Sequence, residues 1–343
     1  MALLHYYKGD NAMFGKTNLT RRATLVGVLA GAFSMALGMP VLAQQDYPNR
    51  PIRMVIPYTP GGSIDTVGRL VAEQLQKQLG HPFVVENRPG ASGMIGSKVV
   101  AEAQADGYTL LFNASSQVQL PYVVSKPPYD ARRDFTPISQ VGYVPLIVVT
   151  NKDFPANDLR EFAALARQNP GKYAWATSGL GTTSHIAEEI IRHELGLDME
   201  IIAYRGAAPQ LTDVMGGHVA AAVSPMPGAM PFVQGGGLKI LAVTSKSPLP
   251  QLPGVATVAE SGIPDFELLS WYGFWGPPGL PAEIAERLAD EAAKAVKVSS
   301  VQARFADLAF EAVGSSPDAF AQVIDEEIEK IRKVVEQTGI RVD

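Results

Sequence analysis

Gly61 and Gly62 separate a strand pattern from a helix pattern, and this junction carries the residues best suited to binding an anion. The apolar run Ile52 to Ile56 has the length of a strand, and apolar residues then recur at helical spacing as far as Leu79. The two glycines let the backbone approach a ligand closely, because glycine tolerates positive φ and carries no side chain. Ser63 occupies the position expected for the N-cap of the helix.

The start of such a helix can bind a carboxylate or a phosphate without a cationic side chain. Its first backbone amides have no partner within the helix, and the aligned peptide dipoles place partial positive charge there. An ordinary glycine turn between a strand and a helix would give the same pattern. This stretch therefore supports two interpretations equally, an anion site and a simple turn.

Three further loops lie between the end of a predicted strand and the start of a predicted helix, namely Asn113 to Ser116, Thr177 to Thr183 and Tyr204 to Ala207. In a parallel sheet, ligands bind beyond the carboxyl ends of the strands, so we expect these loops to face the same site as the glycine loop. Arg205 is the cation inside these motifs. Its charge fits a carboxylate contact or a salt bridge that fixes the loop.

Cofactor and metal motifs are incomplete in this chain. Gly179-Leu180-Gly181 lacks the third glycine of a dinucleotide fingerprint, and no lysine follows it as in a phosphate loop. His185, Glu189 and His193 share one helical face, but the outer pair is about 12 Å apart along the axis, too far for one metal ion. We therefore expect no cofactor and no metal. His185, near the start of its helix, could donate to a ligand or serve in capping or packing.

Strand and helix patterns alternate along the chain, which predicts an α/β fold with parallel strands. Predicted strands cover residues 52–56, 82–86, 108–112, 173–177, 199–203, 218–223, 238–244 and 268–275, and predicted helices cover 64–79, 94–105, 115–124, 157–169, 183–195, 208–216, 227–234, 281–297, 299–308 and 317–336. Residues 135–150 carry two extended runs without a helix, which indicates a crossing into a second domain. The predicted domains are 44–144 with 249–343, and 145–248, with a cleft between them.

Composition excludes several functions. A chain of 343 residues with 46% hydrophobic residues can fill more than one core. Its net charge is −5 and it has no basic tract, so nucleic acid is a poor candidate partner. Cysteine is absent, which excludes disulfides and cysteine nucleophiles.

The first 43 residues have the pattern of an export signal. Lys16, Arg21 and Arg22 precede an uncharged apolar segment, and Val41 to Ala43 supply the small residues that a signal peptidase reads. We expect cleavage after Ala43. The general secretory route and a twin-arginine route both fit these residues.

Six blocks of the chain, in the same order, resemble the signature blocks of the Bug family, the periplasmic solute receptors of tripartite tricarboxylate transporters. The blocks are YPNRPIRMVIPYTPGGSIDTVGRLVA, ENRPGASGMIGSKVVAEAQADGYTLLF, DFTPISQVGYVPLIVV, TSGLGTTSHIAEE, YRGAAPQLTDVMGGHV and WYGFWGPPGLP. The resemblance covers Tyr47 to about Val335. It implies a two-domain, type II periplasmic binding protein fold with the ligand cleft between its lobes, and no catalysis.

The implied ligand is a small organic carboxylate, a monocarboxylate or dicarboxylate, that is delivered to membrane permease subunits of the transporter. Trp271, Tyr272 and Trp275 could give the cleft an aromatic wall suited to an aromatic acid, although aromatic residues in a strand are more often core. A second function fits the same residues, a periplasmic ligand sensor that signals to a two-component sensor kinase. We expect a monomer, because a single cleft and a transient partner require nothing larger.

The resemblance also implies the ligand contacts, largely through main-chain amides and bridging waters. The implied residues are Tyr58, Thr59, Pro60, Gly61, Gly62, Ser63, Asp65, Asn113, Ala114, Ser115, Ser178, Gly179, Gly181, Thr182, Thr183, Tyr204, Arg205 and Gly206, and His185 and Ser224 complete the set of candidate positions. Asp65 lies in the first turn of its helix and is expected to stabilise that turn rather than touch an anion. Ser224 stands where many family members place an acidic residue, which favours a ligand whose far end is apolar, aromatic or neutral.

Overall fold

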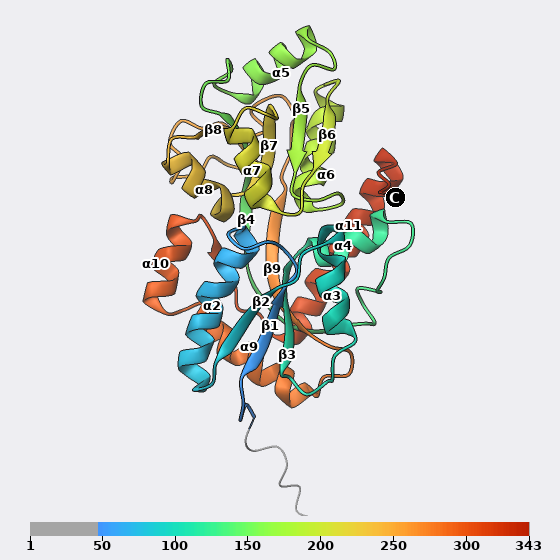
Figure 1. Cartoon of the computed structure of the whole chain (residues 1–343), viewed down its shortest axis with the longest axis vertical. Helices are drawn as coiled ribbons and strands as arrows, with labels where there is room; N and C mark the ends of the chain where they lie inside the picture. Colours follow the sequence, from blue (N-terminus) through green and yellow to red (C-terminus); the bar gives the residue numbers. More distant parts are fainter. Residues whose placement is uncertain (1–46, 343) are drawn as a thin grey trace, which may run out of the picture. The chain divides into compact units, whose positions relative to one another are not determined.

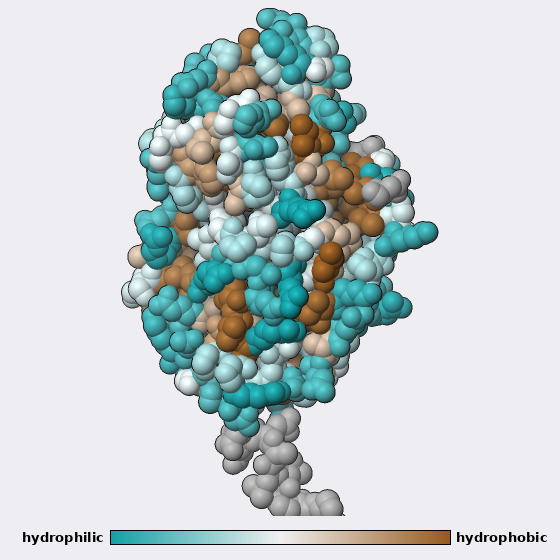
Figure 2. Space-filling model, viewed as in Figure 1, coloured by the Kyte–Doolittle hydropathy of each residue, from teal (hydrophilic) through white to brown (hydrophobic). Residues whose placement is uncertain are grey.

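The computed structural model of the protein describes residues 47–342 (Figure 1). The predicted signal segment, residues 1–43, lies outside the described residues. Within the described part, no helix has the length and apolar composition needed to cross a membrane. On the face shown in Figure 2, hydrophobic residues form several separate patches among hydrophilic ones.

The strands of the described part form one mixed sheet. They are β1 (Ile52–Ile56), β2 (Phe83–Asn87), β3 (Thr109–Ala114), β4 (Thr136–Asn151), β5 (Ala174–Thr177), β6 (Glu200–Ala203), β7 (Ala221–Pro225), β8 (Leu238–Val243), β9 (Leu269–Gly276) and β10 (Glu311–Ala312). The order is β2-β1-β3-β9-β4-β7-β5-β6, with β8 and β10 paired to β4. Pairs within β1–β3 and within β5–β7 are parallel as predicted, whereas β4 and β9 pair antiparallel with their neighbours.

The helices follow the predicted alternation, so the predicted strands and helices are confirmed within a few residues of their ends. They are α2 (Ser63–Leu79), α3 (Met94–Ala101), α4 (Ser116–Val123), α5 (Leu159–Gln168), α6 (Thr183–Glu194), α7 (Ala207–Met215), α8 (Met226–Gln234), α9 (Ala282–Ala295), α10 (Ser299–Asp307) and α11 (Pro317–Thr338), with the short 3-10 helix η1 (Ala91–Gly93) before α3. The two extended runs of residues 135–150 belong to one 16-residue strand, β4. Its register against β9 shifts twice, between Pro137 and Ser139 and between Gln140 and Gly142. These irregularities explain why the sequence of one strand looks like two separate extended runs.

Each lobe has a hydrophobic core, and a smaller buried cluster joins α4 and α11 to Ile186 of α6. We call β1–β3 with α2–α4 and α9–α11 lobe 1, and β5–β8 with α5–α8 lobe 2 (Figure 1). The core of lobe 1 includes Val55, Leu111, Trp275, Phe320 and Ile328, and that of lobe 2 includes Phe162, Trp175, Ile191, Val223 and Leu241. β4 pairs with β9 along its first part and with β7 and β8 along its last part, so it connects the lobes. The separate cores support our proposed domain division, whose boundary at residue 144 falls within β4.

Thr244 joins the segments that cross between the lobes. Its hydroxyl donates to the Leu268 carbonyl oxygen at 2.6 Å and accepts from the Leu146 amide at 2.8 Å. Its own amide donates to the Leu146 carbonyl oxygen at 2.9 Å. The side chain is fully buried, so water cannot replace these bonds. One threonine therefore holds β4, the end of β8 and the chain entering β9 in register.

We expect Thr244→Val to lower the free energy of unfolding by about 2–4 kcal/mol, because it keeps the shape but leaves the buried Leu146 amide and Leu268 carbonyl without the hydroxyl. Urea unfolding followed by circular dichroism measures the change. Thr212→Val is the matched control, since the Thr212 hydroxyl bonds only within its own helix, to the Ala208 carbonyl oxygen. Equal small losses in both variants would contradict this role of Thr244.

Candidate functional site

A cavity of about 50 Å³ lies between the two lobes, beside β9. It is lined from lobe 1 by Tyr58, Gly62, Ser63, Ile64, Asp65, Ala114 and Ser116, from lobe 2 by Ser178, Thr182, Thr183, Ser184, Ala207 and Pro225, and from β9 by Ser270 and Tyr272. The volume is several times the roughly 10–15 Å³ that one water molecule requires. No lysine, arginine or histidine is among these lining residues, so positive potential in the cavity must come from the backbone.

The N-termini of α2 and α6 border this cavity from opposite lobes. Ser63, Ile64 and Asp65 begin α2, and Thr183 and Ser184 begin α6. The first amides of each helix have no partner within the helix and carry the positive end of its dipole. Two helix N-termini and several neutral hydroxyls therefore surround one small space. This arrangement can bind a carboxylate or a phosphate.

Ser63 does not cap α2, so the sequence prediction of its role is wrong. Gly62 is the N-cap, and no side chain caps the helix. The Ser63 hydroxyl instead donates to the Pro225 carbonyl oxygen at 2.9 Å and accepts from the Gly228 amide at 2.7 Å. A Cβ added to Gly228 would lie 2.6 Å from the Ser63 hydroxyl oxygen. Ser63 thus joins lobe 1 to lobe 2 at the cavity, through partners more than 160 residues away.

A second set of hydroxyls joins the lobes on another side of the cavity. The Thr183 hydroxyl donates to Gln119 Oε1 at 3.0 Å, and it lies 2.8 Å from the Ser115 hydroxyl. Because Thr183 has one hydroxyl proton, Ser115 is the donor in the second bond. Gln119 Nε2 in turn donates to Glu327 Oε1 at 2.6 Å. These hydrogen bonds connect α4 to α6 at Thr183 and α4 to α11 at Glu327.

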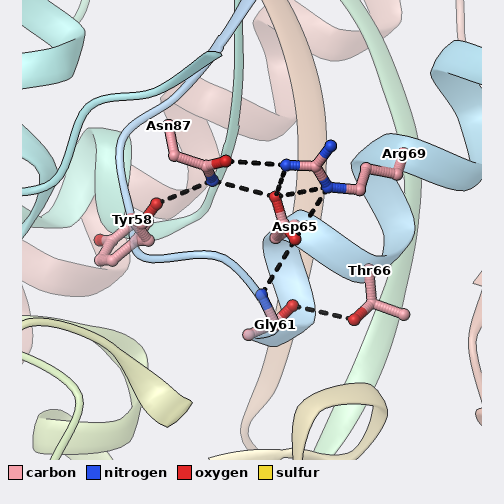
Figure 3. Close-up of polar contacts among 7 residues, drawn as sticks. Tyr58, Gly61, Asp65, Thr66, Arg69 and Asn87 are labelled. Atoms are coloured by element: carbon pink, nitrogen blue, oxygen red, sulfur yellow. Dashed lines mark hydrogen bonds and ion pairs between the residues drawn. The ribbon is translucent and has the colours of Figure 1, made fainter. Parts of the chain in front are cut away.

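Asp65 holds the glycine loop in place (Figure 3). Its Oδ2 accepts from the Gly61 amide at 2.9 Å, its Oδ1 accepts from Asn87 Nδ2 at 2.9 Å, and Arg69 Nε lies 3.0 Å from both oxygens. Burial alone would raise the pKa of Asp65, but the hydrogen bonds from Arg69, Gly61 and Asn87 lower it below its ordinary value. The prediction that Asp65 stabilises this turn is confirmed.

Comparison with known proteins decides the family. Residues 67–340 match the family described as tripartite tricarboxylate transporter family receptor. The chain belongs to this receptor family. It is 35% identical to protein BugT of Bordetella pertussis over 327 residues, which cover 95% of this chain and 99% of BugT.

Solved structures agree with this assignment. The periplasmic binding protein BugD superposes with a TM-score of 0.83 at 32% identity, covering 86% of this chain and 99% of BugD. An R. palustris protein solved with adipate gives a TM-score of 0.84 at 32% identity, covering 86% of this chain and 99% of that protein. The Bug-family resemblance and the periplasmic binding protein fold are confirmed. These homologues are solute-binding receptors, not enzymes.

The receptor's cavity contains part of the predicted contact set. The predicted residues that line it are Tyr58, Gly62, Ser63, Asp65, Ala114, Ser178, Thr182 and Thr183. The predicted residues that do not line it are Thr59, Pro60, Gly61, Asn113, Ser115, Gly179, Gly181, His185, Tyr204, Arg205, Gly206 and Ser224. Seven lining residues were not in the predicted contact set: Ile64, Ser116, Ser184, Ala207, Pro225, Ser270 and Tyr272. Of these, Ser116 and Ala207 end two of the predicted loops, and Tyr272 belongs to the predicted aromatic wall.

Of the three aromatic residues predicted to form a wall of the cleft, Tyr272 lines the cavity and the two tryptophans do not. The alternation of side chains along β9 explains this difference. Successive side chains of a strand point to opposite faces. Trp271 and Trp275 therefore pack together in the core of lobe 1, whereas Ser270 and Tyr272 face the cavity. The period of two in this segment was the signal that could have separated the tyrosine from the tryptophans.

Arg205 and His185 do not take the ligand-facing roles considered for them. Arg205 is exposed, does not line the cavity, and forms no ion pair with any residue of the described part. His185 is buried, and its Nδ1 accepts from the Gly181 amide at 3.1 Å, so its proton belongs on Nε2. Burial lowers the pKa of His185, although the nearby charge of Glu189 opposes the shift. A neutral His185 therefore holds the loop before α6.

Glu188 is a buried carboxyl group that the sequence analysis missed. Its Oε1 accepts from the Val223 amide at 3.0 Å, and its Oε2 has no partner among the described residues. Burial raises the pKa of Glu188 well above its ordinary value, while the hydrogen bond from the Val223 amide and the nearby Thr177 hydroxyl oppose this. The contact fixes β7 at Val223, two residues before the lining residue Pro225.

We expect Glu188→Gln to stabilise the receptor at neutral and alkaline pH. Because the folded-state pKa of Glu188 is raised above the unfolded value of 4.5, its contribution to stability is present below pH 4.5 and falls as pH rises toward the folded pKa. Glutamine keeps the bond to Val223 without ionising. Between pH 4.5 and the folded-state pKa, the free energy of unfolding of the variant should rise relative to the wild type by up to about 1.4 kcal/mol per pH unit.

Thermal unfolding of both proteins between pH 4.5 and pH 8 measures this difference. Glu194→Gln is the control, since Glu194 is exposed on the same helix. A stability difference that does not change with pH would show that Glu188 does not carry a raised pKa.

Proposed function

We propose that this receptor binds a small organic carboxylate in the cavity between its lobes and delivers it to the permease subunits of a tripartite tricarboxylate transporter. The observation that carries the proposal is the approach of two helix N-termini, those of α2 and α6, to a cavity without cationic side chains. A carboxylate can accept from amides at both helix starts. We propose that this work takes place in the periplasm, which the predicted export signal and the family support, and that the receptor acts as a monomer.

The available interactions are strong enough for a receptor. A hydrogen bond to a charged group contributes about 1.5–3 kcal/mol, and a partly buried helix terminus adds up to about 2 kcal/mol. Three or four such contacts approach the roughly 8 kcal/mol of a micromolar complex, even after the cost of ordering. The R. palustris protein solved with adipate shows that a carboxylate occupies a related protein.

Closure of the lobes is part of the proposal. The Ser63 bonds to Pro225 and Gly228 and the Ser115 bond to Thr183 form only when the lobes approach. A ligand between the helix starts would stabilise this arrangement by neutralising their partial charges. The proposed direct contacts are the amides of Ser63, Ile64, Thr183 and Ser184, and the other predicted contacts depend on bridging water.

Carboxylate binding is testable with the protein that lacks residues 1–43. We expect one or a few acids from a panel of monocarboxylates and dicarboxylates to raise the melting temperature, and isothermal titration then gives their affinities. The proposal predicts that amines and neutral sugars of similar size have no effect. A flat response across the whole acid panel would overturn it.

Gly228→Ala should weaken carboxylate binding at least about tenfold, because its Cβ would lie 2.6 Å from the Ser63 hydroxyl oxygen and 2.8 Å from the Ser63 amide nitrogen. Stability without ligand should change little, since lobe separation relieves the contact. Gly235→Ala at the end of the same helix is the control: its φ is −71°, and its nearest contact is an atom of its own helix, the Pro231 carbonyl oxygen. Equal affinity for the two variants would show that closure at Ser63 does not contribute.

A further inference from the structure

Ile186 of α6 carries an apolar contact from lobe 2 to lobe 1. It is 2% exposed and belongs to the smaller buried cluster, whose other members lie in α4, in α11 or just after α11, namely Leu120, Val123, Ile331 and Ile340. None of these five residues lines the cavity. Two residues before Ile186, however, Ser184 is a lining residue at the start of α6. The contact therefore joins the helix start that borders the cavity to lobe 1.

The loop before α6 lies directly on α4. A Cβ added to Gly181 would lie 2.6 Å from Val123 Cγ2 and 2.8 Å from Leu120 Cδ2, so a side chain at position 181 would force these atoms apart. The Gly181 amide donates to His185 Nδ1 at 3.1 Å, which ties the loop to the first turn of α6. Rotation of lobe 2 away from lobe 1 would therefore separate the loop and Ile186 from α4 together.

α11 fixes the lobe 1 side of this contact. Phe320, Ile324 and Ile328 belong to the core of lobe 1, and Ile331 belongs to the smaller cluster with Ile186. Residues spaced by three or four positions share one face of a helix, so these four side chains of α11 form one continuous apolar stripe. Its first part is buried within lobe 1 and its end meets lobe 2. The end of a helix anchored in lobe 1 therefore sets where α6 lies.

Glu327 of α11 adds a polar part to the same contact. Its Oε1 accepts from Gln119 Nε2 at 2.6 Å, and its Oε2 accepts from Trp271 Nε1 at 3.3 Å. Because a carboxylate can only accept, the amide nitrogen of Gln119 must face Glu327, and Gln119 Oε1 is left to accept from the Thr183 hydroxyl at 3.0 Å. Gln119 and Thr183 are 2% and 3% exposed, so water cannot replace this bond. Glu327 thus orients the side chain that holds the first residue of α6.

We propose that these residues hold the lobes closed on the ligand without touching it. We call Gln119, Ile186, Glu327 and Ile331 the closure contact. It keeps the start of α6 against lobe 1, and with it the first amides of α6 at the proposed carboxylate position. Because the ligand leaves only when the lobes separate, the closure contact lowers the dissociation rate and so raises the affinity. Its members are positioning residues, and the inference rests on the proposed carboxylate function.

Two matched pairs of isoleucine variants test the apolar part of the closure contact. Ile186→Ala and Ile331→Ala should each raise the Kd about tenfold, because the closed form loses a buried side chain that the open form exposes. The controls are Ile191→Ala and Ile324→Ala, which lie on the same two helices but are buried in the core of a single lobe. They should lower the melting temperature and keep the Kd within about twofold.

Isothermal titration gives the Kd, and stopped-flow fluorescence gives the dissociation rate. The protein without residues 1–43 is titrated with acetate, propionate, succinate, adipate and phenylacetate, and the variants are compared with the acid that binds most tightly. Most of the loss should appear as faster dissociation, which a general loss of stability would not cause. Ile186→Val or Ile331→Val replaces an alanine variant that fails to fold, with an expected rise in Kd of about two- to threefold.

Two negative outcomes of this experiment are distinct. Unchanged Kd and dissociation rate in the variants of Ile186 and Ile331 would overturn the closure contact and leave carboxylate binding standing. Failure of every acid to bind the wild-type protein would overturn the proposed function, and the closure contact with it.

Glu327→Ala tests the polar part. It should raise the Kd about three- to tenfold, because Gln119 loses the acceptor that orients it. Glu327→Gln keeps an acceptor oxygen for Gln119 and should recover most of the affinity, and Glu326→Ala, exposed on the same helix, should change nothing. In a double-mutant cycle, adding Glu327→Ala to Thr183→Val should not raise the Kd further, since both changes break one chain of hydrogen bonds. Independent effects that multiply would overturn the positioning role of Glu327.

Discussion

The approach of the α2 and α6 N-termini to one cavity is the constraint on which the rest of the structure depends. A buried anion needs donors that replace its water, and no cationic side chain lines this cavity. The donors must therefore be backbone amides and neutral hydroxyls, and the amides of two lobes reach one ligand only when the lobes lie close together. The sheet supports this, because β4 and β9 connect the lobes and Thr244 holds the crossing segments in register.

Close approach explains the glycines of the ligand loops better than flexibility does. An added Cβ would lie 2.5 Å from the Thr59 hydroxyl oxygen at Gly206 and 2.9 Å from the Ser92 hydroxyl oxygen at Gly179. Gly228 meets Ser63 in the same way. These positions bring the loops of one lobe against those of the other. The residues thus serve the seam between the lobes, even where they do not line the cavity.

Ionisable side chains near the cavity are either hydrogen-bonded within the protein or held in their neutral form. Asp65 is ionised but bonded to Arg69, Asn87 and the Gly61 amide. His185 is held neutral and accepts from a loop amide, and burial disfavours the charged form of Glu188 beneath β7. Each fixes a loop or strand end without adding a mobile charge. The result is a hydroxyl-lined cavity whose one ionised lining residue, Asp65, is already bonded to Arg69, Asn87 and the Gly61 amide.

The sequence by itself determined the elements and the family, because helix and strand periods are local and the signature blocks are contiguous. It located β1, α2 and the helix end at Gly80, where a left-handed backbone favours glycine. The fold decided which side chains meet. Ser63 bonds to lobe 2 instead of capping its helix, Tyr272 faces the cavity, and Arg205 does not. These outcomes depend on contacts between residues more than a hundred positions apart in the sequence. A local sequence pattern does not contain that information.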